Sequence, residues 1–232
     1  MAEFLWRVRR GSALTHFSDG LVVQGGPRGL LFLSACRTAG RSVSPGAFGL
    51  LGPLAAACAS EGIRRDTGII SWLHWPDLVT IDGRVVSKTS LSVTPLAEPD
   101  QKAQVVFGVT VNCFASRPTS FPSVLPASSI LDALGVEIDL NLLRDKILHA
   151  LDWYFAEWER GVHRKLVDRI RPTIAWLGHD VEVRMADSRV LKGTAEGLDD
   201  EGALLLAQRA GRESKKTVAL PPESVAFVLA VK

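Results

Sequence analysis

The stretch VTIDGRVV, residues 79–86, predicts the element around which the fold is organised. Runs of β-branched residues flank Asp82-Gly83, and this dipeptide tolerates the positive φ angles of a two-residue type I′ turn. We therefore predict a hairpin of two antiparallel strands whose second arm extends to Thr94. Outward from the hairpin, apolar runs predict further strands at residues 29–34, 68–75 and 104–114.

Three further segments predict helices. Ser44-Pro45 is typical of a helix start, and that helix is expected to lie close against the sheet through its alanines and to stop at Gly62. Ser129 is predicted to open a short helix that Gly135 ends. Asp139 is predicted to cap a long helix with one apolar stripe. The stripe consists of Leu143, Ile147, Leu151, Phe155 and Trp158.

After residue 176 the sequence changes to short alternating runs separated by turn residues. The runs cover residues 180–185, 190–195, 202–207 and 217–220. Strands of this length and spacing are typical of a small β-barrel. Its predicted core includes Val181, Val183, Val190, Leu204, Leu206 and Val218. We therefore expect two domains, residues 1–172 and 173–232.

The composition limits the classes of protein to consider. With 232 residues, 47% of them apolar, the chain can form one sizeable core and a small second one, which excludes a disordered chain. The net charge of +2 gives no overall attraction to nucleic acid. Cys36, Cys58 and Cys113 are widely spaced, so we expect buried free thiols and no structural zinc site.

The start of the chain does not have the pattern of a signal peptide, since its apolar run is only Phe4-Leu5-Trp6. The longest stretch without a charge, residues 42–60, is expected to be a buried helix and not a membrane span. Fewer than about 30 residues precede the first predicted strand, too few for a helix-turn-helix domain. We expect a cytoplasmic protein with neither membrane nor nucleic-acid partners.

Four motifs, taken in order, resemble those of biotin protein ligases. Residues 72–77, WLHWPD, with 82–84, DGR, are similar to that family's KWPND segment and the hairpin after it. Residues 107–112, FGVTVN, are similar to its GIGIN strand, with Thr110 in place of the second glycine. The predicted helices of residues 129–158 and the predicted barrel after Trp176 complete the series.

This resemblance implies an α+β fold of the class II aminoacyl-tRNA synthetase and biotin ligase type. A mixed, mainly antiparallel sheet with helices on one face would be followed by a small SH3-like barrel. It implies binding of ATP, Mg²⁺ and biotin, formation of biotinyl-5′-AMP, and transfer of biotin to a lysine of a biotin carboxyl-carrier protein. It is also compatible with a homodimer.

The chemistry requires cations and N–H groups around the α-phosphate, where negative charge builds up. Residues 6–12 are the one stretch that can stand for the family's Gly/Arg loop, through Arg7, Arg9, Arg10 and Gly11. On the hairpin Arg84 matches the family's arginine, but Val85 occupies the position of its lysine and Lys88 that of its glycine. Side chains three apart in a strand point to opposite faces, so Lys88 replaces the lysine only if a bulge shifts the register.

The resemblance assigns six residues to the ligand pocket: His74, Trp75, Pro76, Asp77, Gly108 and Asn112. His74 stands in place of a lysine and Asp77 in place of an asparagine. For two of these residues a structural role stays open, namely packing in the core for His74 and a structural hydrogen bond for Asn112. Gly108 is expected to let the strand approach a ligand closely.

Three functions stay open. The protein is a working biotin protein ligase with an unusual site, a catalytically inactive relative that binds a small ligand or a protein partner, or a relative that handles lipoate or octanoate. We expect weak or absent ligase activity unless a loop arginine, Arg84 or Lys88 reaches the sheet face that carries Asn112. If the missing lysine is the sole defect, Val85→Lys is expected to raise activity.

Overall fold

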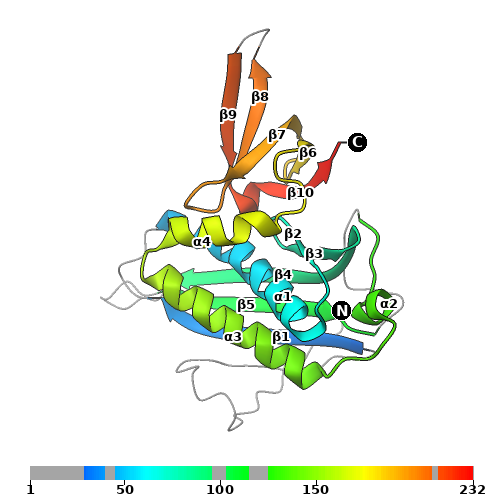
Figure 1. Ribbon diagram of the computed structural model, residues 1–232. Coiled ribbons are helices and arrows are strands. Elements are labelled where there is room, and N and C mark those ends of the chain that lie inside the picture. Colours follow the sequence, from blue (N-terminus) through cyan, green and yellow to red (C-terminus); the bar gives the residue numbers. More distant parts are fainter. Residues whose placement is uncertain (1–28, 40–44, 96–102, 115–124, 211–213, 232) are drawn as a thin grey trace.

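The computed structural model describes residues 29–39, 45–95, 103–114, 125–210 and 214–231, which form two five-stranded sheets and their helices (Figure 1). The first sheet has the order β1-β5-β4-β3-β2. Its strands are β1 (Leu30–Ala39), β2 (Trp72–His74), β3 (Leu78–Ile81), β4 (Arg84–Pro95) and β5 (Ala103–Asn112). Its ladders are antiparallel, and parallel pairing among the described residues is confined to two isolated bridges.

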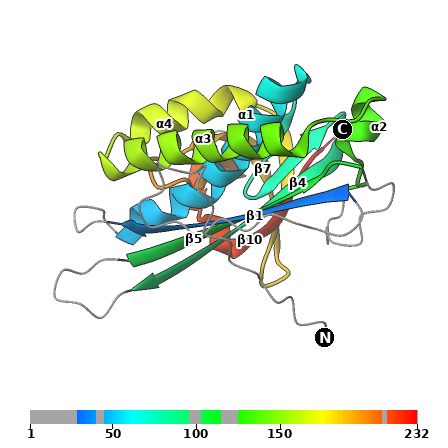
Figure 2. The same cartoon turned by 90° about the horizontal axis from the view of Figure 1, so that it is seen from below.

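Helices cover one face of this sheet, as Figure 2 shows for α1 and α3. The helical elements are η2 (Pro45–Leu50), α1 (Leu51–Thr67), α2 (Ile130–Leu134), α3 (Leu140–Glu159), α4 (His163–Ile170) and η3 (Arg171–Thr173). The predicted stripe of α3 is buried, with every member at most 5% exposed. Ser129 and Asp139 cap α2 and α3 as predicted, and Gly135 ends α2 with a φ of 73°.

The second sheet has the order β10-β6-β7-β8-β9 and is of the SH3-like barrel type. Its elements are β6 (Asp180–Met185), β7 (Val190–Leu198), β8 (Leu204–Ala210), β9 (Ser214–Leu220), η4 (Pro222–Ser224) and β10 (Val225–Ala230). The sequence patterns missed β10. They were also wrong about Val190, which is 43% exposed, because it pairs with the outward-facing Arg184 while Leu191 packs against the core.

The predicted hairpin is confirmed. Ile81 pairs with Arg84 across the two-residue turn, and Asp82 and Gly83 have φ angles of 49° and 72°. Both positive angles are those of a type I′ turn, whose twist matches that of the flanking strands. This turn sets the starting register of β4 against β3.

The predicted end of the first helix was wrong. The helix α1 continues through Gly62 to Thr67, and Gly68 ends it with a φ of 73°. Gly62 instead permits close packing of two helices, because a Cβ at this position would lie 2.4 Å from Cγ1 of Ile147 in α3. The alanines of α1 are buried between the sheet and α3.

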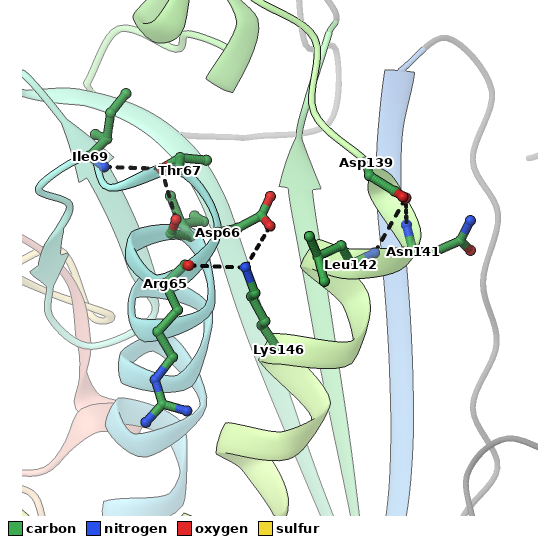
Figure 3. Close-up of polar contacts among 9 residues, drawn as sticks. Arg65, Asp66, Thr67, Ile69, Asp139, Asn141, Leu142 and Lys146 are labelled. Carbon is green, nitrogen blue, oxygen red and sulfur yellow. Dashed lines mark hydrogen bonds and ion pairs between the residues drawn. The ribbon is translucent and has the colours of Figure 1, made fainter.

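A polar contact joins the end of α1 to α3 (Figure 3). Lys146 donates to a side-chain oxygen of Asp66 at 2.9 Å and to the main-chain oxygen of Arg65 at 3.0 Å. The cation thus faces the negative end of the α1 dipole and a carboxylate whose side chain is 4% exposed.

By length and composition alone, residues 46–67 could cross a membrane, but 78% of their most apolar window is buried within the protein. This burial is what a core helix requires. The cysteines are free thiols. Cys58 and Cys113 are buried as predicted, whereas Cys36 is partly buried. Burial raises the pKa of both buried thiols, that of Cys113 to about 12.

Gly62→Ala should lower the free energy of unfolding by about 1–3 kcal/mol, because the added methyl group must push α3 away. Gly52→Ala is the matched control in the same helix, since a Cβ there meets nothing within 4 Å. The control should be neutral or stabilising by up to about 1 kcal/mol, owing to the better helix propensity of alanine. Urea unfolding of both variants measures the difference, and equal stability would contradict the packing argument.

Candidate functional site

The WLHWPD stretch makes the junction between the two sheets. His74, 8% exposed, bonds through Nε2 to the main-chain oxygen of Val228 in β10, and the Nε1 of Trp75 donates to the oxygen of Gly202 at 3.1 Å. Both rings pack edge-on against Trp176, with centroids 6.2 and 6.5 Å away. These two predicted pocket residues therefore hold the sheets together.

Close main-chain contacts complete this junction. Gly202 has a φ of 84°, and a Cβ there would lie 2.6 Å from the Cα of Leu50 in η2. A Cβ on Gly49 would lie 2.8 Å from the main-chain oxygen of Glu201. The turn before β8 is thus pressed against the start of the first helix.

Pro76 and Asp77 lie beside a cavity of about 560 Å³ between the sheets. Its walls come from η2, β4, the turn before β8 and residues 221–226. The charged groups of this lining are the carboxylates of Asp77, Glu201 and Glu223. The cavity is therefore unsuited to the phosphates of ATP.

A β-bulge in β4 decides which side chains reach the other face of the first sheet, the open face opposite α1 and α3. Leu78 pairs with Lys88 and Val79 with Ser87, but the next residue, Thr80, pairs with Val85. Val86 is therefore the extra residue of β4. Since paired residues share a face, Val85 and Lys88 lie on the same side although they are three apart. The register shift that Lys88 needs to replace the lysine is therefore present.

Pairing with β5 identifies this side as the open face. Lys88 is opposite Thr110, whereas Val105, Phe107, Val109 and Val111 alternate with it and are buried in the core under the helices. Lys88 thus shares a face with Thr110 and Asn112. Its ammonium lies 3.5 Å from Asp77 Oδ2, and the two side chains are 34% and 32% exposed. Burial raises the pKa of Asp77, and the charge of Lys88 opposes that rise.

Next to Lys88 the open face carries a groove of about 480 Å³. Its lining is uncharged and includes four hydroxyl side chains. The lining residues are Phe32, Leu33 and Ser34 of β1, Ser90, Leu91 and Ser92 of β4, and Val106, Gly108, Val109 and Thr110 of β5. Phe32 and the three serines were not predicted from the sequence, although the period-two alternation of polar and apolar residues in β1 and β4 could have revealed them.

The remaining predicted residues are dispersed. Val85 is fully buried against Leu78, Leu125 and Ala127. Asn112, also fully buried, donates through Nδ2 to the main-chain oxygen of Ser128 at 2.8 Å, so it makes the structural bond that the sequence left open. Arg84 is exposed next to the hairpin turn and is not part of the groove lining. Arg7, Arg9, Arg10 and Gly11 lie outside the described residues.

Comparisons with known proteins agree with this architecture. The family profile of the "Biotin protein ligase C terminal domain" matches residues 177–219, the greater part of the second sheet. The "Bifunctional ligase/repressor BirA" of Bacillus subtilis is 30% identical over 161 residues, which are 68% of this chain and 48% of that protein. The chain belongs to the biotin protein ligase family. It spans about half the length of the curated relatives that it matches.

Two solved structures share the fold of this family member. The biotin protein ligase of Aquifex aeolicus superposes with a TM-score of 0.71 at 17% identity, over 91% of this chain and 88% of that one. A "biotin protein ligase-like protein of unknown function" from Silicibacter sp. TM1040 superposes with a TM-score of 0.68 at 18% identity, over 88% and 84%. The Aquifex enzyme has also been solved in complex with biotin and ATP.

The open face suits an acyl group better than a triphosphate. The groove offers hydroxyl groups and apolar surface, and Lys88, one residue pair away, is the cation next to it among the described residues. Those described residues hold no cluster of three His, Cys, Asp or Glu side chains suited to a metal ion.

The junction should be sensitive to pH. Burial lowers the pKa of His74, and the Val228 carbonyl opposes that shift. A base with a lowered pKa in the folded state contributes stability that is complete above its unfolded pKa of about 6.5 and is lost as the pH falls below that value. The melting temperature should therefore fall more steeply from pH 7.5 to 5.5 in the wild type than in His74→Gln. Equal slopes would contradict the assignment.

The structure reverses the expectation for Val85→Lys. A lysine in this fully buried apolar site should lower the free energy of unfolding by about 3 kcal/mol or more, and it should not raise activity. Val93→Lys, on the same strand at a residue that is 36% exposed, is the control and should cost less than about 1 kcal/mol. Chemical unfolding measures both, and a stable, more active Val85→Lys protein would contradict the burial argument.

Proposed function

We propose that this protein activates biotin with ATP to biotinyl-5′-AMP and transfers the biotin to a lysine of a biotin carboxyl-carrier protein. The observation that carries the proposal is the bulge at Val86, which puts Lys88 on the open face beside the hydroxyl-lined groove. Lys88 then supplies the positive charge for which the family uses a lysine three positions earlier. Family membership and the fold support the same reaction.

In this proposal Lys88 has two tasks. Its ammonium would attract the carboxylate of biotin and then stabilise the negative charge that builds on the α-phosphate of bound ATP during attack. Asp77 positions the ammonium through the 3.5 Å ion pair, and Asp77 is itself held because its main-chain oxygen accepts hydrogen bonds from the N–H and Oγ1 of Thr89. The pair would have to separate partly when an anion binds.

The second candidate is a catalytically inactive relative that binds a small ligand or a protein partner. Two observations favour it: the family's lysine position, Val85, is buried under residues 125–127, and Lys88 already has a carboxylate partner. A third candidate, a lipoate or octanoate ligase, would use the same face. We also propose that the protein acts on a biotin carboxyl-carrier protein, forms a homodimer and is cytoplasmic. We further propose a boundary between its two domains at residues 172 and 173.

ATP–pyrophosphate exchange dependent on biotin tests the first candidate. The wild type should catalyse exchange, and Lys88→Ala should reduce the rate by about 10²–10³-fold because a cation beside the reacting phosphate is lost. Lys88→Arg should retain part of the rate. Lys192→Ala, at a residue whose side chain is 73% exposed on the second sheet, should change nothing.

Each candidate predicts a different result of this experiment. A Lys88→Ala protein that exchanges like the wild type would exclude the role of Lys88. A folded wild type that is silent with biotin but active with lipoate or octanoate would favour the third candidate. If the wild type catalyses no exchange with any of these acids, although its melting temperature shows that it is folded, the inactive relative would be the remaining candidate.

A further inference from the structure

The turn between β7 and β8, residues 199–203, is held in shape by the side chain at its start. Oδ1 of Asp199 accepts hydrogen bonds from the N–H groups of Glu201, at 3.0 Å, and of Ala203, at 2.8 Å. The main chain closes the same turn, because the N–H of Asp199 donates to the oxygen of Ala203 and the N–H of Gly202 to the oxygen of Asp199. An aspartate that bonds to the main chain in this way fixes the path of a turn.

This turn of the second sheet also contacts the first sheet and its helix. The main-chain oxygen of Gly202 accepts the hydrogen bond of Trp75 Nε1 at 3.1 Å, and both residues are buried. Gly202 also lies against Leu50, since a Cβ on this glycine would come within 2.6 Å of the Leu50 Cα. The turn therefore lies between the indole of Trp75 and the start of α1, and at such packing it cannot shift without displacing one of them.

Trp75 connects this turn to the charged pair on the open face. Two residues after it, Asp77 lies 3.5 Å from the ammonium of Lys88. The main-chain oxygen of Asp77 accepts a hydrogen bond at 2.8 Å from the N–H of Thr89, the neighbour of Lys88 in β4. The position of Asp77 thus depends on two attachments, one to Thr89 within the first sheet and one, through Trp75, to the turn of the second sheet.

We propose that Asp199 is a positioning residue for the reaction at Lys88 and that it acts through the turn 199–203, Trp75 and Asp77. The inference rests on the proposed function, and it gives the second sheet a part in holding the cation in place. Asp199 is not among the residues that line the cavity between the sheets or the groove of the open face. Its role requires an acceptor oxygen and no negative charge, so asparagine at this position retains the role.

Hydrogen exchange followed by NMR on the full chain tests the positioning without depending on turnover. In Asp199→Ala the indole N–H of Trp75 and the main-chain N–H of Thr89 should exchange about 10-fold faster, because two hydrogen bonds that resist local opening are lost. The N–H of Val109, in a strand paired on both sides, is the internal reference for global unfolding. The acceleration should exceed any change at Val109.

Two further variants sharpen the test. Asp187 makes the same kind of bond in the turn between β6 and β7, where its Oδ1 accepts from the N–H of Arg189 at 3.0 Å. Asp187→Ala is therefore the matched control, and it should leave hydrogen exchange at Trp75 and Thr89 unchanged. Asp199→Asn should behave like the wild type, because its amide oxygen still accepts both hydrogen bonds.

Biotin-dependent pyrophosphate exchange tests the consequence for the reaction. Asp199→Ala and Asp77→Asn should each lower the rate by roughly 3- to 10-fold, and the double variant should be no slower than the slower single variant. The effects should not multiply because both substitutions act through one ion pair with Lys88. A loss of stability alone would give no such coupling between the two positions.

The outcomes separate this inference from the proposed function. Unchanged hydrogen exchange at Trp75 and Thr89 in Asp199→Ala, or an equal acceleration in Asp187→Ala, would overturn the inference even if the wild type catalysed pyrophosphate exchange. Multiplied losses of rate in the double variant would overturn it as well. Faster local hydrogen exchange in a protein whose wild type is silent with biotin would support the positioning of Asp77 by Asp199 and reject the proposed reaction.

Discussion

One extra residue in a β-strand determines what this protein can do on the open face of its first sheet. Val86 is inserted opposite the β3 ladder, so the alternation of β4 changes phase between Val85 and Lys88. Before the bulge, the side chain of Val85 is buried under residues 125–127. Beyond it, Lys88, Ser90 and Ser92 point away from the helices. A regular strand would direct these polar groups into the core, where unpaired they would cost several kcal/mol.

The second constraint is the junction between the sheets. In sequence, WLHWPD has the composition of a binding motif, with two tryptophans, a histidine and an acid. In the structure His74 and Trp75 bond to main-chain oxygens of the second sheet and pack against Trp176. The polar atoms of His74 and Trp75 thus have their hydrogen-bond partners within the protein. Their contribution to the site is to fix the position at which Asp77, the last residue of the motif, contacts Lys88.

The sequence predictions succeeded where a signal is local. The Asp82-Gly83 turn, the caps of Ser129 and Asp139, and the stripe of α3 depend on dihedral preferences and periodicity within a few residues. The failures involve contacts between distant segments. Gly62 has the appearance of a helix end until Ile147 is found against it, and Val190 has the appearance of a core residue until its partner Arg184 is known. Prediction of the candidate site was limited in the same way. From the sequence, the cation of Lys88 could be assigned to the site only if a bulge shifted the strand register.

By itself, the sequence determined most of the strands and helices up to β9 and their order, the family, and a short set of polar residues that included Lys88, Gly108 and Asn112. Turn chemistry, helix caps and the order of motifs all act along the chain, so they can be recognised without knowing the fold. Tertiary structure alone decided how those residues are used. Asn112 is consumed by a bond to Ser128, Gly108 by the hydroxyl of Ser90, and Lys88 is turned to the open face. The reason is that the facing of a side chain depends on strand register, and register is set by pairing across the sheet and by the core beneath it.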